Sequence, residues 1–342
     1  MQGSSRIDPA AATVLHVTSN GHGMGHLSRQ AAIALSDSDP GDHAVASLST
    51  AAPMLRRLGL RSEYIAGFDR GQIPRAHWDG YLRDRLGALV ELTGARVMIF
   101  DADTPQQYPG VLMAAQQHPH LRTVWCRRGF WHCGFEEILP WADGFDAVLE
   151  PGDLVAEYDD GATSGLPAHR IRPVSMVDAL RRVHGTLPDR VAAAEALGLD
   201  PDRPAVLVSL GSGTLGSAAD AAQTALAHLN DADWQVVLTR APIAGVSPLA
   251  EDARVRVLSG VFPLAQYLAA FDAAVISAGY NGVHEVIPAR IPALVIPNPV
   301  WAIDNQHARA RSLATAGLAL YAHPSDEEGV AAAVRTLLDP SW

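Results

Sequence analysis

The sequence predicts an α/β protein with two domains, each built on a parallel sheet that helices cover. Two observations carry this prediction. Short apolar runs of strand length alternate with helix-like segments along both halves of the chain, and this alternation is typical of βαβ units. The 342 residues also exceed what one hydrophobic core usually covers and suit two domains of ordinary size. We expect the two sheets to face a cleft between the domains.

The first half contains five strand-like runs. They are TVLHVTS, HAVASLS, RVMIFD, RTVWC and FDAVLE, in chain order. Helix-like segments separate them, for example at about residues 26–35 and 78–92. Parallel strands need such crossover helices between them. We place this N-terminal domain at residues 1–175.

The alternation pauses over residues 176–203, which read as a linker with proline and glycine turns. It restarts with AVLVSL and continues through WQVVLTR, VRVLSG, AAVISAG and PALVIPN. The second domain is therefore expected at residues 204–322. Residues 323–342 are predicted to add a C-terminal helix.

The composition disfavours several partners and chemistries. The formal charge is −11, which argues against a broad basic surface for nucleic acid. All 26 basic residues are arginine, so no lysine is present for a Schiff base or a phosphate loop. Cys126 and Cys133 are too few for a disulfide framework and lack the usual spacing of a zinc site, so no metal is expected. The chain has neither a membrane-spanning run of about 18 apolar residues nor a signal-like N-terminus, and we expect a cytoplasmic protein.

The segment NGHGMGHLSRQ, residues 20–30, follows the first strand-like run. Its glycines lie where a strand passes to a helix, together with His22 and His26. The spacing differs from the G-x-G-x-x-G of dinucleotide sites, and no acidic residue follows the second strand, which disfavours a dehydrogenase. Two interpretations remain for this turn alone: a phosphate loop, or a backbone that holds a histidine against a substrate.

Polar or glycine-rich loops follow four strand-like runs of the second half. They are VSLGSGTL at 208–215, SGVFPLAQYL at 259–268, SAGYNGVHE at 277–285 and IPNPVWAIDNQ at 296–306. Ligands of open α/β sheets bind beyond the carboxyl ends of the strands. SAGYNGVHE also opens a helix, and N–H groups at a helix N-terminus attract phosphate. An ordinary strand–turn–helix junction is the alternative for that stretch.

Taken in order, these loops resemble the donor signature of the inverting nucleotide-sugar glycosyltransferases of the GT-B fold. The matching elements are VSLGS, VFPL, SAGYNGVHE, RIP and DNQ, within residues 205–310. This family includes the N-acetylglucosaminyltransferase of peptidoglycan synthesis and the plant and antibiotic UDP-glycosyltransferases. The resemblance implies two Rossmann-like domains, a donor site in the C-terminal domain, and a UDP-sugar as co-substrate without a further cofactor.

By position, the resemblance implies a set of donor-binding residues. They are Ser212, Gly213 and Thr214 beside the phosphates, Phe262 at the base, Ser277, Gly279, Asn281 and Gly282 at the diphosphate, Glu285 on the ribose, and Asp304 and Gln306 on the sugar. The sequence departs from the signature at Val261, where many members stack a tryptophan on uracil, and at Ser277, where many have a phosphate-binding histidine. The signature ends in an adjacent aspartate and glutamine, whereas this sequence reads DNQ, with one extra residue. Asn305 and Gln306 are therefore both candidates for the position of the glutamine.

The same family places its general base on a histidine of the first strand–helix turn, often within GMGH. This implies His26, with His22 as the competitor. A histidine titrates near neutral pH and suits proton abstraction from a hydroxyl group. Its other ring N–H needs an acceptor, and RVMIFDAD supplies Asp101 and Asp103. We favour Asp101 because it directly follows the strand.

Two alternatives remain for these aspartates. DAD is formally a metal-binding D-x-D motif, and an aspartate at a strand end also caps turns. Retaining GT-B enzymes commonly carry a second glutamate eight residues after the first, at a position that Ala293 occupies here. The missing glutamate favours inversion.

The acceptor side is expected to involve Gly25, His22, Asp103, Arg127 and Arg128, the last two from WCRRGFWHCGFEE at 125–137. A packed loop is the alternative for that segment. We therefore expect an inverting, metal-independent glycosyltransferase that moves a sugar from a UDP-sugar to a small hydroxyl-bearing acceptor. A UDP-sugar hydrolase and a UDP-sugar epimerase of the same fold are the alternatives. No nucleic-acid partner is expected, and a homodimer stays open as the assembly.

Overall fold

The computed structural model describes residues 13–19, 24–68, 73–210, 219–230, 233–240, 254–299 and 302–339. By their internal contacts the residues form two compact units. Unit 1 comprises Met1–Arg128, Cys133–Gly152 and Gly165–Arg172. Unit 2 comprises Gly129–His132, Asp153–Ser164 and Pro173–Trp342. Two short segments of the first half of the chain thus belong to the second unit.

Unit 1 contains a seven-stranded parallel sheet of order β3-β2-β1-β4-β5-β6-β7. The strands are β1 (Val14–Thr18), β2 (His43–Ser47), β3 (Arg61–Tyr64), β4 (Val97–Asp101), β5 (Arg122–Cys126), β6 (Ala147–Pro151) and β7 (His169–Ile171). The central strand β1 is apolar and buried on both faces, as expected for a parallel sheet between helices. Thr18 pairs with Ser47 on one side and Asp101 on the other, so the carboxyl ends of these three strands meet at one edge.

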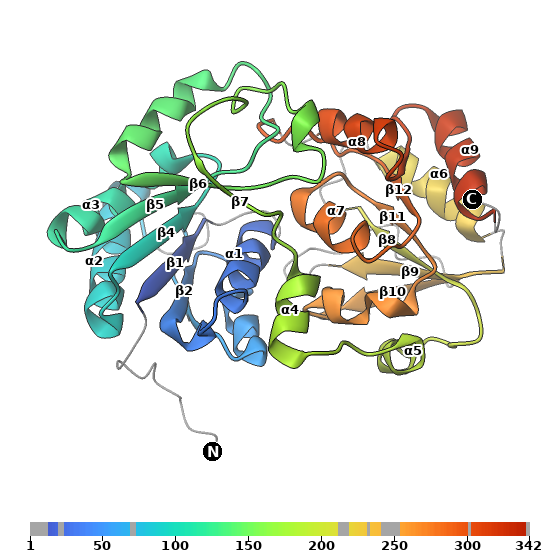
Figure 1. The fold of residues 1–342 in the computed structure, drawn as a ribbon, viewed down its shortest axis with the longest axis horizontal. Helices are drawn as coiled ribbons and strands as arrows, with labels where there is room; N and C mark the ends of the chain where they lie inside the picture. Colours follow the sequence, from blue (N-terminus) through green and yellow to red (C-terminus); the bar gives the residue numbers. More distant parts are fainter. Residues whose placement is uncertain are drawn as a thin grey trace. The chain divides into compact units, whose positions relative to one another are not determined.

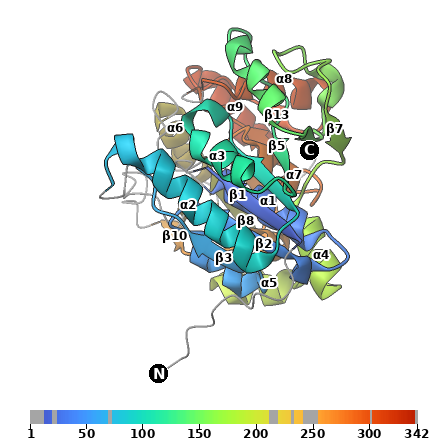
Figure 2. The ribbon, with the colours of Figure 1, turned by 90° about the vertical axis from the view of Figure 1, so that its left-hand side faces the viewer.

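The helices of unit 1 are α1 (Gly25–Leu35), α2 (Arg75–Thr93) and α3 (Pro109–Gln117), and a 3-10 turn, η2 (Ala52–Leu58), connects β2 to β3. α1 lies on one face of the sheet and α2 and α3 lie side by side on the other (Figures 1 and 2). The strand order explains this arrangement. The chain passes from β1 to β2 and β3 toward one edge of the sheet, and then returns to β4 and β5 on the other side of β1. Because each crossover is right-handed, this reversal of direction places the later helices on the opposite face.

Unit 2 contains a six-stranded parallel sheet of order β10-β9-β8-β11-β12-β13. The strands are β8 (Ala205–Ser209), β9 (Gln235–Arg240), β10 (Val255–Ser259), β11 (Ala273–Ile276), β12 (Ala293–Val295) and β13 (Leu320–Tyr321). Ile276 pairs with Ser209 and with Val295. The loops that follow these three strands therefore leave the sheet at the same edge.

The helices of unit 2 are α4 (Met176–His184), α5 (Arg190–Leu197), α6 (Ala219–Asn230), α7 (Tyr280–Val286), α8 (Gln306–Thr315) and α9 (Glu327–Leu337), with a 3-10 turn η8 (Leu264–Ala270). α6 and α9 pack together on one face of the sheet (Figure 1). Leu229 of α6, Val330 of α9 and Leu294 of β12 belong to one buried apolar cluster between these helices and the sheet. α4 and α5 pack against η8.

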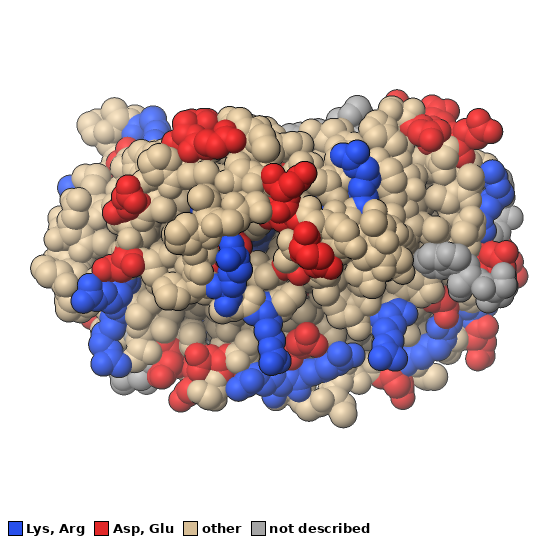
Figure 3. Space-filling view, turned by 45° about the horizontal axis from the view of Figure 1, so that its top comes forward, with Lys and Arg blue, Asp and Glu red and all other residues tan. Residues whose placement is uncertain are grey.

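The two parallel sheets confirm the α/β fold predicted from the alternating runs. Among the described residues, no helix is long and apolar enough to cross a membrane. On the face drawn in Figure 3, arginine and acidic side chains are interspersed with uncharged residues between them. That face therefore carries charge of both signs.

The contact between α2 and α3 gives a test of the packing. A Cβ atom at Gly110 would lie 2.5 Å from the backbone oxygen of Asp79, whereas at Gly87 it would meet only side-chain ends, His118 Nε2 at 3.3 Å and Gln117 Oε1 at 3.7 Å. Backbone cannot yield as a side chain can, so we expect Gly110→Ala to lower the free energy of unfolding by about 1–3 kcal/mol. Gly87→Ala should be neutral or stabilising by up to about 1 kcal/mol, because alanine favours a helix interior. Urea unfolding of both variants measures this, and equal effects would contradict the described packing.

Candidate active site

His26 lies in the first turn of α1, the helix that follows β1 in the chain. His22 falls outside the described residues. Gly25 opens the helix, and a Cβ atom at that position would meet no atom of the described residues within 4 Å.

The carboxylate of Asp101, at the end of β4, is completely buried beside His26. Its Oδ1 lies 2.6 Å from His26 Nδ1. Arg29 donates from Nε to Oδ2 at 2.9 Å and from Nη2 to Oδ1 at 2.5 Å. Gln30 donates from Nε2 to Oδ2 at 2.8 Å. Four donors from one helix therefore converge on this single carboxylate.

The charge of Asp101 fixes the proton on His26. Burial opposes ionisation, but the Arg29 charge, followed by His26, outweighs it and holds the pKa of Asp101 well below its usual range. Burial likewise opposes the charge of Arg29, yet Asp101 raises the pKa of Arg29 overall. His26 Nδ1 lies 2.6 Å from Asp101 Oδ1 and 3.1 Å from Arg29 Nη2. Arg29 Nη2 already donates to Asp101 Oδ1, and an ionised carboxylate only accepts hydrogen bonds, so the shorter contact places the proton of His26 on Nδ1. His26 Nε2 is then the nitrogen with a free lone pair.

A chain of buried hydrogen bonds continues behind Asp101. The Oε1 atom of Gln30 lies 2.6 Å from Nδ1 of His16, and Nε2 of His16 lies 2.8 Å from Nδ1 of His43. Because the Gln30 amide nitrogen faces Asp101, its oxygen must accept from His16. Burial lowers the pKa of His16 to about 4, so this ring is neutral at neutral pH with its proton on Nδ1. His43 then donates to His16.

Arg29, Gln30 and His16 were not predicted from the sequence. The signal for the first two was present in GHLSRQ, because positions three and four residues after His26 share its face of a helix. His16 lies within the strand-like run TVLHVTS, where the apolar pattern gives no indication of a polar contact.

The other acceptor-side residues divide into two groups. Asp103 Oδ2 lies 4.0 Å from His26 Nε2, and Arg128 Nη2 holds the same oxygen at 2.6 Å. Arg127 instead pairs with Glu150 at 3.1 Å, and both side chains are buried. Asp103 and Arg128 are thus near the free nitrogen of His26, whereas Arg127 is engaged with β6.

Four of the predicted donor residues of unit 2, Ser277, Gly279, Asn281 and Gly282, follow the end of β11. Gly279 precedes α7 as its N-cap. A Cβ atom there would lie 3.6 Å from Ser277 Oγ and 3.8 Å from Gln306 Nε2. Asn281 and Gly282 lie in the first turn of α7. Ser212, Gly213 and Thr214 fall outside the described residues.

Asp304 and Gln306 lie in the loop that leads into α8. Gln306 Nε2 donates to Asp304 Oδ2 at 3.4 Å, and Gln306 Oε1 accepts from the backbone N–H of Asn298 at 3.0 Å. Asn305 caps α8 by accepting from the backbone N–H of Ala308 at 3.0 Å. Gln306 therefore faces the Gly279 turn, while the side chain of Asn305 serves the helix end.

Glu285 and Phe262 complete the predicted donor set. Glu285 is half-buried on α7, and among the described residues its carboxylate has no hydrogen-bonding partner. Burial raises the pKa of Glu285 to about 7. Phe262 is half-buried in the loop between β10 and η8. In the sheet order, β9 and β8 separate β10 from β11.

Phe130 and Trp131, in the segment expected at the acceptor side, are buried within unit 2. Trp131 forms an antiparallel bridge with Asp304. The backbone N–H of Asn305 donates to Phe130 O at 2.7 Å, and that of His132 donates to Ile303 O at 2.9 Å. The two aromatic residues thus support the Asp304 loop from behind.

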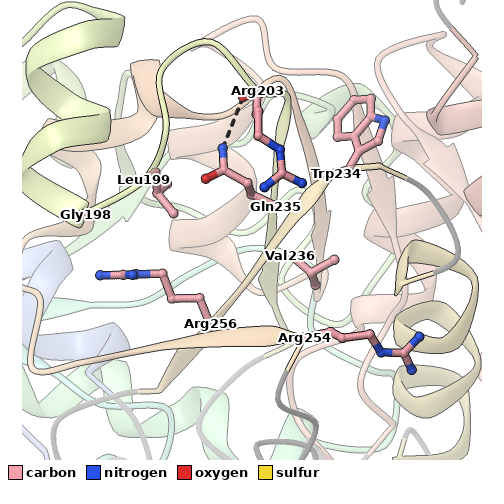
Figure 4. A pocket seen from close by; sticks show the side chains of 8 residues that line it. All are labelled: Gly198, Leu199, Arg203, Trp234, Gln235, Val236, Arg254 and Arg256. Atoms are coloured by element: carbon pink, nitrogen blue, oxygen red, sulfur yellow. Dashed lines mark hydrogen bonds between the residues drawn. The ribbon is translucent and has the colours of Figure 1, made fainter.

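Unit 2 also has a hollow of about 360 Å³, lined by Arg203, Trp234, Arg254 and Arg256 among others (Figure 4). Trp234 and Arg254 directly precede β9 and β10. The hollow therefore lies at the amino ends of these strands. Ligand sites of open α/β sheets lie at the opposite, carboxyl ends, so this hollow is separate from the candidate site.

No family model and no curated protein matches the chain. Solved structures do. MurG of Acinetobacter baumannii is 16% identical, with 96% of this chain and 91% of that chain covered and a TM-score of 0.55. The spinosyn rhamnosyltransferase SpnG, complexed with thymidine diphosphate, is 17% identical (96% and 92% covered, TM-score 0.56). A UDP-GlcNAc 2-epimerase from Methanocaldococcus jannaschii is 10% identical (95% and 92% covered, TM-score 0.60).

The chain has the GT-B fold. This confirms the fold that the donor signature implied. The similarity covers nearly the whole chain in each comparison, so both units contribute to it.

The buried Asp101–Arg29 pair predicts a pH-dependent stability. Asp101→Asn leaves the Arg29 charge without its partner and should lower the free energy of unfolding at pH 7 by about 3–5 kcal/mol. Because the folded-state pKa of Asp101 is depressed, its contribution is present above the ordinary pKa of about 4 and is lost as the pH falls through the folded value. The difference between the wild type and the variant should therefore shrink below about pH 4.

Urea denaturation across a pH series measures this difference. The control is Asp103→Asn, whose partly exposed pair with Arg128 should be worth about 1 kcal/mol or less. A difference for Asp101→Asn that stays constant down to pH 2 would contradict the ionised, buried carboxylate.

Proposed function

We propose that the protein is an inverting glycosyltransferase that moves a sugar from a nucleoside diphosphate sugar, with UDP expected, to a hydroxyl group of a small acceptor. The observation that carries this proposal is the contact of 2.6 Å between His26 Nδ1 and Asp101 Oδ1. It orients a histidine as a general base with Nε2 available. The GT-B fold shared with the rhamnosyltransferase SpnG supports it.

In the proposed reaction, His26 Nε2 takes the proton of the acceptor hydroxyl. The acceptor oxygen attacks the anomeric carbon, and the bond between that carbon and the diphosphate oxygen breaks on the opposite side. The configuration inverts and the nucleoside diphosphate leaves. Asp101 stabilises the imidazolium that forms, because its charge faces Nδ1–H. Arg128 and Asp103 lie beside Nε2 and are the residues we propose to contact the acceptor, with Gly25 giving access.

The donor is proposed to bind unit 2. Backbone N–H groups at Gly279, Asn281 and Gly282 would receive the diphosphate, with Ser277 beside them. Ser212, Gly213 and Thr214 would border the same phosphates, and Phe262 the base. Glu285 would accept from the ribose hydroxyls, which suits a half-buried carboxylate that has no hydrogen-bonding partner among the described residues. Asp304 and Gln306 would bind hydroxyls of the sugar. That SpnG was solved with thymidine diphosphate supports a nucleoside diphosphate as part of the donor.

A second candidate is a UDP-sugar epimerase of the same fold. The TM-score of 0.60 with the UDP-GlcNAc 2-epimerase exceeds the 0.55 with MurG. An epimerase would also break the bond between the anomeric carbon and the diphosphate. It would, however, return the sugar in an isomerised form instead of passing it to an acceptor.

Incubation with UDP-sugars and TDP-sugars, alone and with a panel of small alcohols and glycosides, tests the proposal. Binding of the correct nucleotide should first raise the melting temperature in proportion to its occupancy. We expect nucleoside diphosphate to be released only with an acceptor present, and the product to have the inverted anomeric configuration by NMR. Free sugar without an acceptor would instead indicate a hydrolase, and an isomerised sugar an epimerase; either would contradict the transferase.

A further inference from the structure

Arg309 is a completely buried arginine on α8, five residues after Asp304. Its Nε donates to Asp153 Oδ2 at 2.9 Å. Its Nη1 donates to Asp304 Oδ1 and to the backbone oxygen of Ala278, each at 2.9 Å. The guanidinium carbon lies 5.0 Å from the centre of the Phe130 ring. One side chain thus joins α8 to three other segments of unit 2.

The Nη1 atom links the two halves of the proposed donor site. Ala278 directly precedes Gly279, where the diphosphate is proposed to bind, and Asp304 is the carboxylate proposed for the sugar. Since the same nitrogen holds both, it sets the distance between the Gly279 turn and the Asp304 carboxylate. The other carboxylate oxygen, Asp304 Oδ2, faces Gln306, so Arg309 and Gln306 hold the two oxygens of Asp304 in different directions.

Asp153 holds the other side of the guanidinium. Asp153 Oδ1 lies 3.7 Å from His284 Nε2, but that nitrogen accepts from the backbone N–H of Leu154 at 3.1 Å. His284 therefore carries no proton on Nε2 and does not form an ion pair with Asp153. Asp153 and Asp304 instead share the charge of Arg309, and a planar fork suits two carboxylates that approach different nitrogens.

We propose that Arg309 is a positioning residue that sets the affinity of the site for the sugar part of the donor, with little effect on the nucleotide part. This inference rests on the proposed function, because it takes Asp304 to be the ligand of the sugar hydroxyls. Arg309 itself is enclosed and acts through Asp304. Fixing Oδ2 in one orientation would favour sugars that present a hydroxyl in the matching direction.

Arg309→Lys separates positioning from charge. Lysine keeps one positive charge for the two buried carboxylates, so the fold should persist. An ammonium group cannot hold Asp153 and Asp304 from two nitrogens in a fixed plane, so the Asp304 carboxylate should become free to turn. The matched control is Arg311→Lys, since Arg311 is exposed on the same helix.

The test compares binding of UDP-glucose, UDP-N-acetylglucosamine and UDP itself by calorimetry. For Arg309→Lys we expect the Kd of the preferred sugar nucleotide to rise about tenfold, which is the loss of roughly one good hydrogen bond to a charged group. The Kd of UDP should change less than twofold, and Arg311→Lys should change neither. Equal weakening of the sugar nucleotide and UDP, or no weakening of either, would overturn the positioning role.

Asp153→Asn provides a second test, which remains valid even if Arg309→Lys fails to fold. Asp153 holds Arg309 but lies outside the proposed donor residues. Its amide should loosen the guanidinium and raise the Kd of the sugar nucleotide several-fold, again with UDP unchanged; an unchanged Kd for both would count against the proposal. If the wild type binds neither UDP nor a sugar nucleotide, the proposed function fails and this inference with it. If the wild type binds both ligands but the variants do not show the expected changes in Kd, the proposed function stands and the positioning role of Arg309 fails.

Discussion

The buried carboxylate of Asp101 is the constraint on which the candidate catalytic geometry depends. Its charge is stable in the interior only because Arg29 and Gln30 donate to it from α1, and removing such partners from a buried charge is costly. Once the carboxylate is ionised, the proton of His26 must lie on Nδ1, and the tautomers of His16 and His43 follow in turn. A single charge at the end of β4 thus determines which nitrogen of His26 carries the proton and which keeps its lone pair.

The fold could be predicted from the sequence because its central strands are buried on both faces, which makes them continuous apolar runs. TVLHVTS and AVLVSL became β1 and β8 for this reason. The edge strands were harder to find. β3, Arg61–Tyr64, and β7, His169–Ile171, are polar and partly or fully exposed, so they carry no apolar signal. Their place in the sheet comes from pairing with a neighbouring strand, which a single sequence does not encode locally.

The candidate site was predictable where chemically suitable residues stand at the ends of strand-like runs. GMGHL follows the first strand-like run, Asp101 stands at the end of the run RVMIFD, and the structure brings His26 and Asp101 together. Contacts that join distant segments had no such signal. Asp153 and Arg309 are 156 positions apart and meet only in the folded unit. The segment with Phe130 and Trp131 left an acceptor site and a packed loop open, and in the structure these two residues pack against the Asp304 loop of unit 2.

The central claim assigns proton abstraction to unit 1 and donor binding to unit 2. His26→Ala tests it most directly when turnover and donor binding are measured on the same preparation. The account predicts that turnover falls by about 10²–10⁴-fold, the usual contribution of a general base, while the Kd of the sugar nucleotide and the melting temperature stay close to those of the wild type. Full turnover in the variant would contradict the assignment of His26 as the base.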